Sequence, residues 1–222
     1  MMLFKQKKRR KLLTTLYPDI CPYCREVMLS GDYACDKCKK NLSGIPYSKY
    51  AQGGYHCVSA VPYDGKFASA VLSFKFYDMR QFDYPLAKAI AAAISKKFAN
   101  IKFDFITFVP LHKKRLAERG YNQSELLANC LSQILNIPVV NTLNKTRNTK
   151  PQHKVKGSKR AENVKGAYKV IDKDFVKNKH ILLIDDIITT GNTLGECAKT
   201  LDAEAPLSIH CATFAITIPK TT

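Results

Sequence analysis

Two adjacent carboxylates stand just before a run of threonines and a glycine, in the sequence Ile184-Asp-Asp-Ile-Ile-Thr-Thr-Gly-Asn-Thr193. A glycine-containing turn that opens a helix offers backbone N–H groups and hydroxyls as a cradle for phosphate. Carboxylates beside such a cradle would repel an anion unless they meet hydroxyl groups or a cation. A ribose 5-phosphate satisfies both halves, with Asp185 and Asp186 accepting hydrogen bonds from its 2- and 3-hydroxyls and Mg²⁺ nearby. The residues of the phosphate loop would be Thr189, Thr190, Gly191, Asn192 and Thr193. The alternative is an ordinary Asp-Asp turn with a threonine N-cap.

Four of the 8 cysteines fall in one window, as Cys21-Pro-Tyr-Cys24 and Cys35-Asp-Lys-Cys38. Two residues between the cysteines of each pair let both thiolates face one ion, and the intervening loop brings the pairs together. The spacing predicts a tetrahedral, structural zinc site that leaves no position open for chemistry. A redox or disulfide pair is the alternative. The remaining cysteines occur singly, and we interpret them as buried thiols.

A strand must precede the two carboxylates to position them, and a helix must follow the phosphate loop. The run from His180 to Asp185 is typical of a central parallel strand that is buried on both faces. After the loop, apolar positions at 194, 197, 198 and 201 predict a helix, with Thr193 and Glu196 as a capping box. Further strands are predicted over 58–63, 103–109, 137–140, 167–171 and 207–218, and helices over 67–76, 86–98 and 121–135. This alternation predicts an α/β fold, an open, mostly parallel sheet with helices on both faces.

The length of 222 residues, 45% of them hydrophobic, allows one substantial core and a small appendage. We predict a region over 1–56 that holds a basic N-terminus, the cysteine module and a loop or linker over 43–56, followed by the α/β domain over 57–222. No apolar run approaches the roughly 20 residues of a membrane-spanning helix, and residues 12–17 are too short and polar for a signal peptide. We therefore expect a cytoplasmic protein without membrane insertion.

The net charge of +18 and the isoelectric point near 9.6 indicate anionic partners. Lysines and arginines concentrate over 5–11 and 145–179. Such runs fit a solvated face, the steering of a phosphorylated ligand, or contacts with nucleic-acid phosphates.

The sequence LLIDDIITTGNT closely resembles the signature of type I phosphoribosyltransferases for phosphoribosyl pyrophosphate (PRPP), and the surrounding motifs resemble the ComF family of that fold. The central segment from Val109 to Leu127, VPLHKKRLAERGYNQSELL, carries this resemblance. Two shorter motifs follow it, Arg147-x-Thr149-x-x-Gln152 and Arg160-x-x-Asn163-x-x-Gly166-Ala-Tyr168. With the paired cysteines, the resemblance runs from about Cys21 to the C-terminus.

The resemblance implies a type I phosphoribosyltransferase fold, with a parallel five-stranded core under a hood built from the zinc knuckle and neighbouring segments. Asp185 and Asp186 would bind the ribose, and 111–115 would form the pyrophosphate loop, with Lys114 and Arg115 near the diphosphate. Residues 145–165 would close over the site and supply cations such as Lys154, Lys156 or Arg160. Pyrophosphate would leave C1 through an oxocarbenium-like transition state, with Asp185, Asp186 and Arg115 as the catalytic residues.

No motif names the acceptor of the phosphoribosyl group or a general base. His112, His153 and Glu118 are candidates by residue type only, and ordinary exposed side chains are the alternative for each.

The ComF family is linked to natural competence, so the resemblance also implies single-stranded DNA as a partner, and a competence helicase or other DNA-uptake proteins. A non-catalytic DNA-binding competence factor is thus the second hypothesis, with Tyr17, Tyr23 and Tyr47 as stacking residues. A PRPP-responsive repressor ranks last, because no segment before Cys57 is long enough for a convincing helix-turn-helix.

Overall fold

The computed structural model describes residues 19–28, 32–42, 44–77, 79–149 and 160–218. The chain forms two compact units, Met1–Gly44 and Ile45–Thr222. This division falls earlier than the predicted one at residue 57, because Tyr47–Ala51 forms a strand of the main sheet. The interpretation of 43–56 as loop or linker is therefore wrong for that strand.

The first unit holds the paired cysteines. Strands β1 (Asp19–Ile20) and β2 (Val27–Met28) pair antiparallel, and helix α2 (Asp36–Leu42) follows them. Cys21 and Cys24 lie in the turn between the strands, Cys35 stands just before α2, and Cys38 lies within it.

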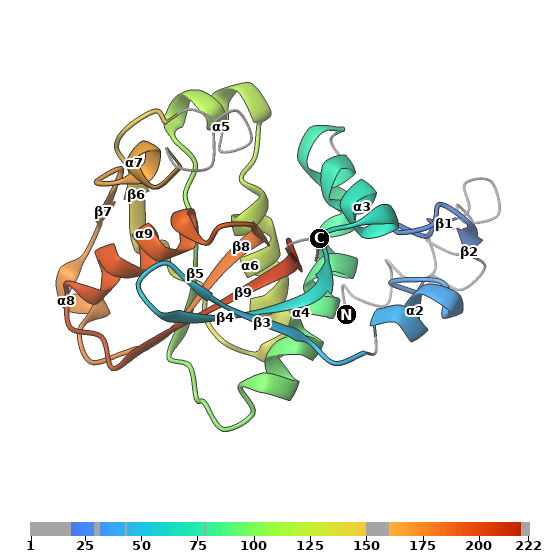
Figure 1. Ribbon diagram of the computed structural model, residues 1–222, viewed down its shortest axis with the longest axis horizontal. Helices are drawn as coiled ribbons and strands as arrows, with labels where there is room; N and C mark the ends of the chain where they lie inside the picture. The colour runs from blue at the N-terminus through green and yellow to red at the C-terminus, as the bar shows by residue number, and fades with distance from the viewer. Residues whose placement is uncertain (1–18, 29–31, 43, 78, 150–159, 219–222) are drawn as a thin grey trace, which may run out of the picture. The chain divides into compact units, whose positions relative to one another are not determined.

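The second unit is built on a five-stranded sheet with the order β3-β4-β9-β8-β5 (Figure 1). The strands are β3 (Tyr47–Ala51), β4 (Tyr55–Pro62), β5 (Phe105–Phe108), β8 (His180–Ile188) and β9 (Ser208–Ile216). Four of them run parallel, whereas β3 pairs antiparallel with β4. The predicted open, mostly parallel sheet is confirmed, but the expected five-stranded parallel core is corrected by β3, which is a hairpin strand at the edge.

Helices cover both faces of this sheet. Helices α4 and α6 contact strands on one face, and α9 lies against the other (Figure 1). The elements are α3 (Gly65–Phe76), η1 (Arg80–Phe82), α4 (Asp83–Lys97), α5 (Lys113–Arg119), α6 (Gln123–Leu135), α7 (Arg160–Val164), α8 (Lys173–Val176) and α9 (Asn192–Asp202). Among the described residues, no helix is long and apolar enough to cross a membrane.

Of the predicted strands, the one over 167–171 forms but lies outside the five-stranded sheet, and the one over 137–140 does not form as a strand. Strands β6 (Leu143–Lys145) and β7 (Tyr168–Val170) make a separate antiparallel pair. The strand predicted over 137–140 is reduced to an isolated parallel bridge between Val139 and Ile106. Pro138 lacks the N–H that a continuous ladder needs, and its carbonyl accepts from Ile106 instead.

Helix α9 buries the predicted apolar stripe of Leu194, Cys197, Ala198 and Leu201. The predicted capping box is wrong. The N-cap is Gly191, at φ 78°, and Glu196 instead accepts a hydrogen bond from the Gly166 N–H at 2.6 Å. Glu196 thus ties α9 to the segment between α7 and β7.

Candidate functional site

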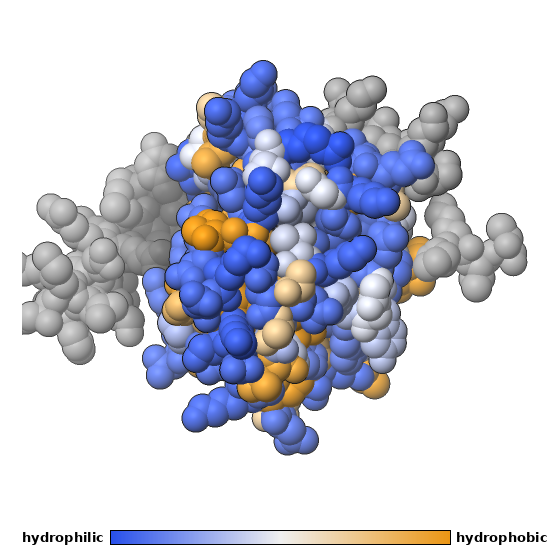
Figure 2. All heavy atoms as spheres, turned by 90° about the vertical axis from the view of Figure 1, so that its left-hand side faces the viewer, coloured by the Kyte–Doolittle hydropathy of each residue, from blue (hydrophilic) through white to orange (hydrophobic). Residues whose placement is uncertain are grey.

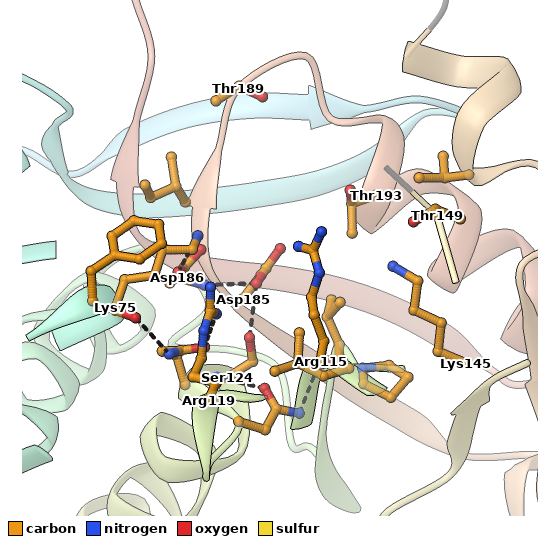
Figure 3. Close-up of a pocket in the computed structure, with 18 of the residues that line it drawn as sticks. Lys75, Arg115, Arg119, Ser124, Lys145, Thr149, Asp185, Asp186, Thr189 and Thr193 are labelled. Atoms are coloured by element: carbon orange, nitrogen blue, oxygen red, sulfur yellow. Dashed lines mark hydrogen bonds and ion pairs between the residues drawn. The ribbon is translucent and has the colours of Figure 1, made fainter. Parts of the chain in front are cut away.

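A cavity of about 490 Å³ lies at the carboxyl ends of β5 and β8, where open α/β sheets bind their ligands (Figure 3). Asp185 and Asp186 enter it from β8, and segment 109–111 enters it from β5. Helices α3, α5 and α6 and the pair β6–β7 supply the other walls. Sequence positions from Tyr63 to Thr193 therefore meet in one hollow.

Asp185 is held by two donors. Its Oδ1 accepts hydrogen bonds from the Ser124 hydroxyl at 2.8 Å and from the Asp186 backbone N–H at 2.9 Å. Burial and the adjacent charge of Asp186 raise the pKa of Asp185 to about 7, against the lowering influence of Lys75 and these two donors. This carboxyl group therefore titrates near neutral pH.

Asp186 is paired with a cation. Its Oδ2 lies 2.8 Å from the Lys75 Nζ at the end of α3, and the carboxylate is buried. Burial lowers the pKa of Lys75, but the charge of Asp186 and their hydrogen bond outweigh it and raise the pKa overall. The Lys75 ammonium therefore stays charged beside Asp186, and the two neighbouring carboxylates have different partners, since Asp185 accepts from Ser124 and from a backbone N–H.

The predicted phosphate loop surrounds a smaller hollow next to the same carboxylates. Residues 187–194 line it, together with Asp185. The glycine at 191 takes a left-handed conformation, and α9 starts directly after it, so its first N–H groups face the loop. Thr189 and Thr193 also line the main cavity. The loop and the carboxylate pair therefore form one continuous surface.

Strand β3 and the turn that follows it hold this loop in place. The Lys49 Nζ donates to the Thr189 carbonyl at 2.5 Å, and the Gln52 N–H donates to the Gly191 carbonyl at 3.3 Å. A Cβ on Gly191 would lie 2.8 Å from the Ala51 Cα, and one on Gly195 would collide with the Gln52 carbonyl oxygen. Glycine at both positions is what lets the backbones approach this closely.

Cations lie on both sides of Asp185. In Figure 3, Arg115 and Lys145 lie on the side of Thr193, whereas Lys75 and Arg119 lie on the other. Burial and the neighbouring charge of Arg115 lower the pKa of Lys145 despite the opposing influence of nearby acidic groups. The Lys145 Nζ stands 5.2 Å from the centre of the Tyr168 ring. Tyr168 is buried, and its hydroxyl has no hydrogen-bond partner among the described residues.

The structure brings most of the predicted site residues together. Asp185, Asp186 and Arg115 line the main cavity, and 189–193 line one or both hollows. Lys114, by contrast, is exposed on α5 and does not line the cavity. Its backbone N–H donates to the Nδ1 of His112, the buried N-cap residue of α5. Glu118 is exposed and also stands outside the cavity lining.

Several lining residues were missed by sequence reasoning. Ser124 and Arg119 fall within the segment that resembles the ComF family, so the signal was present but not assigned to them. Lys75 had no sequence signal, because its place opposite Asp186 follows from how α3 packs. The positions Tyr17, Gln152, His153, Lys154 and Lys156 lie outside the described residues, as does the side chain of Arg160.

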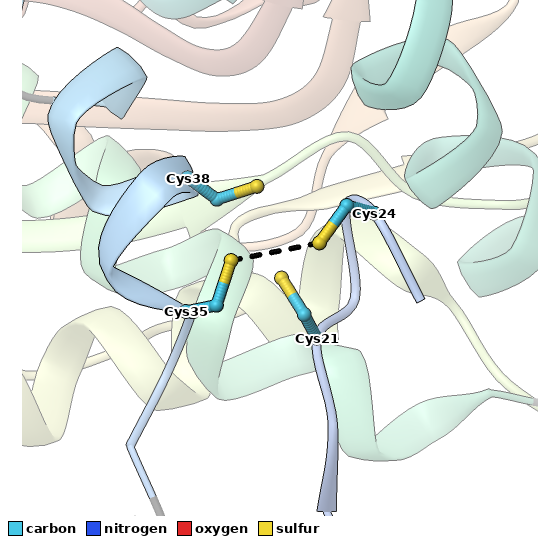
Figure 4. A group of neighbouring side chains, drawn as sticks. All are labelled: Cys21, Cys24, Cys35 and Cys38. Atoms are coloured by element: carbon cyan, nitrogen blue, oxygen red, sulfur yellow. Dashed lines mark hydrogen bonds between the residues drawn. The ribbon is translucent and has the colours of Figure 1, made fainter. Parts of the chain in front are cut away.

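The four paired cysteines form a separate cluster (Figure 4). Their sulfur atoms all lie within 4.8 Å of one another, and the Sγ atoms of Cys24 and Cys35 are 3.5 Å apart. A tetrahedral ion with bonds of about 2.3 Å to sulfur needs sulfur separations slightly below 4 Å. Cys21, Cys24, Cys35 and Cys38 can therefore hold a metal ion such as zinc, and none of them is in a disulfide.

Comparisons with known proteins agree with this architecture. Residues 84–220 match the phosphoribosyl transferase domain family. Competence protein F of Haemophilus influenzae is 30% identical over 205 residues, which cover 82% of this chain and 90% of that protein. DNA utilization protein YhgH of Escherichia coli K12 is 25% identical, over 86% of this chain and 82% of that protein. Competence protein ComFC of Bacillus subtilis is 26% identical, over 86% and 75% respectively. With the signature LLIDDIITTGNT at the carboxyl end of β8 and a type I phosphoribosyltransferase fold around it, this chain belongs to the ComF family.

Proposed function

We propose that this chain binds PRPP together with Mg²⁺ and transfers its phosphoribosyl group to an acceptor. One observation carries the proposal, namely that the carboxylate pair and the phosphate loop line the same cavity. A phosphate in the loop would place the hydroxyl groups of an attached ribose within reach of Asp185 and Asp186. The diphosphate on C1 would then extend toward Arg115 and Lys145.

During the proposed transfer, negative charge develops on the leaving pyrophosphate and positive charge on the ribose. The C1–O bond breaks, pyrophosphate leaves with the electron pair, and the nucleophile of the acceptor forms the new bond to C1. Arg115 and Lys145 would stabilise the charge that develops on the leaving group, while Asp185 and Asp186 would stabilise the positive ribose. The carboxylate oxygens are ligands of the kind that Mg²⁺ prefers, and the ion would supply further positive charge against the diphosphate.

The cysteine cluster has a structural role in this proposal. With four thiolates, a bound zinc ion keeps no open position for a substrate, so it would stabilise the first unit rather than take part in transfer. Metal binding would supply much of the folding energy of so small a unit.

The names of the relatives support a role in competence or DNA use, and we propose that the chain acts there in the cytoplasm. A second candidate function, binding of single-stranded DNA, is favoured by exposed cations on the segments around β6, β7 and α8. Figure 2 shows that hydrophilic side chains dominate the face of the molecule with these elements. The described exposed cations there are Arg147, Lys165, Lys169, Lys173 and Lys177. Phosphate contacts of this kind predict an affinity for DNA that falls steeply with salt, and weak binding at physiological salt would exclude this function.

Isothermal titration calorimetry tests the main proposal. Zinc-loaded protein is titrated with PRPP and Mg²⁺, beside the double variant Asp185→Asn/Asp186→Asn and the control Asp174→Asn. Asp174 is an exposed residue of α8, outside the cavity. Saturable binding by wild type and control, lost in the double variant, supports the proposal. The absence of binding to the wild type would refute it.

A further inference from the structure

The end of the cavity on the α3 side has an apolar wall. Leu72 and Phe76 stand one helical turn apart on α3, and Tyr63 follows β4. Leu72 is 41% and Phe76 54% exposed although both line the cavity. Large apolar side chains left open beside a carboxylate pair offer a surface on which a flat ring can stack.

Arg119 adds an unneutralised charge beside this wall. Its guanidinium lies 5.4 Å from the centre of the Phe76 ring, and one nitrogen donates to the Gln123 Oε1 at 2.6 Å. No carboxylate of the described residues forms an ion pair with it. Burial lowers the pKa of Arg119, against the opposing charge of Asp186. A guanidinium in this state has several donors free, and their geometry suits a carboxylate.

The other polar side chains at this end are already engaged. Asn122 donates to the Val109 carbonyl and accepts from the Ser124 N–H, and Gln123 donates to the Lys75 carbonyl at 3.5 Å. Asp186 is paired with Lys75 through one oxygen, and in the proposed transfer it also accepts from the ribose. These amide and carboxylate groups therefore leave few hydrogen-bond acceptors for the amino groups of a neutral base. The free donors of Arg119, by contrast, favour an anionic ligand.

We propose that the phosphoribosyl acceptor is a planar aromatic carboxylate, stacked on Phe76 and bound through its carboxylate by Arg119. This inference rests on the proposed transfer reaction and names the acceptor class for it. A nitrogen lone pair of the acceptor forms the bond to C1 as the C1–O bond breaks and pyrophosphate leaves with its electron pair. A proton on that nitrogen, where there is one, passes to water.

Matched pairs of small molecules test the charge requirement. Full-length, zinc-loaded protein is titrated calorimetrically with nicotinate and nicotinamide, orotate and uracil, and anthranilate and aniline, with and without ribose 5-phosphate and Mg²⁺. At least one carboxylate is expected to bind roughly tenfold or more tightly than its uncharged partner, since a charge-assisted pair is lost in the latter. Equal binding within every pair would overturn the proposal.

Variants assign the effect to residues. Arg119→Met should abolish the preference for the carboxylate, Arg119→Lys should keep part of it, and Phe76→Leu should weaken both members of a pair. Lys88→Met removes an exposed cation on α4 outside the cavity and should preserve the preference.

PRPP titrations of the same proteins separate this inference from the proposed function. If PRPP binds and no carboxylate does, the acceptor class is wrong and the transfer proposal stands. If Arg119→Met weakens PRPP binding as much as carboxylate binding, Arg119 serves PRPP and this inference fails. If carboxylates bind through Arg119 but PRPP does not bind at all, the site is supported and phosphoribosyl transfer is refuted.

Discussion

Replacing Asp185 by asparagine is expected to stabilise the unliganded protein at pH 8, although the same change should weaken ligand binding. The carboxylate is held in the cavity wall beside Asp186, where its charged form is disfavoured and its pKa is raised from 3.8 to about 7. Asparagine has nearly the same shape and keeps an oxygen that can accept from the Ser124 hydroxyl. The substitution therefore removes a poorly solvated charge with little change in packing.

The size and sign of the effect follow from proton linkage. Between pH 3.8 and about 7 the unfolded chain has lost the Asp185 proton while the folded protein keeps it. The free energy of unfolding therefore decreases as the pH rises through this window and levels off above it. One pKa unit corresponds to about 1.4 kcal/mol, so this carboxyl group would lower the free energy of unfolding by up to roughly 3 kcal/mol between pH 5 and pH 8. Solvent in the cavity screens part of this charge, and we expect about 2 kcal/mol.

Urea unfolding followed by circular dichroism at pH 5 and pH 8 measures this difference. Between pH 5 and pH 8 the free energy of unfolding should fall by about 2 kcal/mol more in the wild type than in Asp185→Asn, because all other titrating groups are common to both proteins. Asp174→Asn serves as the control, since this exposed carboxylate is outside the cavity. An identical pH dependence for wild type and Asp185→Asn would refute the reasoning.

Three further predictions concern the metal cluster, the phosphate loop and Ser124. Cys35→Ser should abolish binding of one equivalent of zinc, measured with a chromophoric chelator, and retention of that equivalent would argue against a four-thiolate site. Gly195→Ala should destabilise the protein by roughly 1 to 3 kcal/mol and weaken ribose 5-phosphate binding, because the added Cβ meets the Gln52 carbonyl. A thermal melt measures the loss of stability and calorimetry measures the loss of binding. An unchanged melting temperature would contradict the close approach. Ser124→Ala removes a donor that lowers the pKa of Asp185, so PRPP affinity should fall by several-fold near pH 6.5 and much less at pH 8.5; a pH-independent loss would exclude this cause.

The sequence predicted those helices and strands whose burial follows a regular pattern along the chain. The strand from His180 and the stripe of α9 were predictable because burial on both faces and helical periodicity leave direct traces in the sequence. Strand β3 was missed, because its residues Tyr47–Ala51 have a mixed and largely exposed surface and gain order by pairing with β4. The capping box failed because Glu196 has a stronger partner across the fold, the Gly166 N–H, than its own helix end.

In the candidate site, too, the residues that are contiguous in sequence were predictable and those brought together by packing were not. The loop and the carboxylate pair are contiguous in sequence, so their types and spacing were sufficient to predict their joint position at the strand end. Lys75, Arg119 and Lys145 come from separate elements, and only the packing of those elements brings them to the cavity. The opposite error occurred at Lys114, where nearness in sequence to Arg115 suggested a shared role, although α5 directs the two side chains to different surroundings.

The close approach of the β3–β4 turn to the phosphate loop also limits how this chain can be altered. Residues 52–54 are exposed and include two glycines, and such hairpin tips usually tolerate inserted residues, tags or new chain ends. Here the Gln52 backbone lies directly against Gly191 and Gly195. An insertion at this tip would therefore reshape the phosphate loop, and a protein engineer should place labels and fusions elsewhere on the second unit.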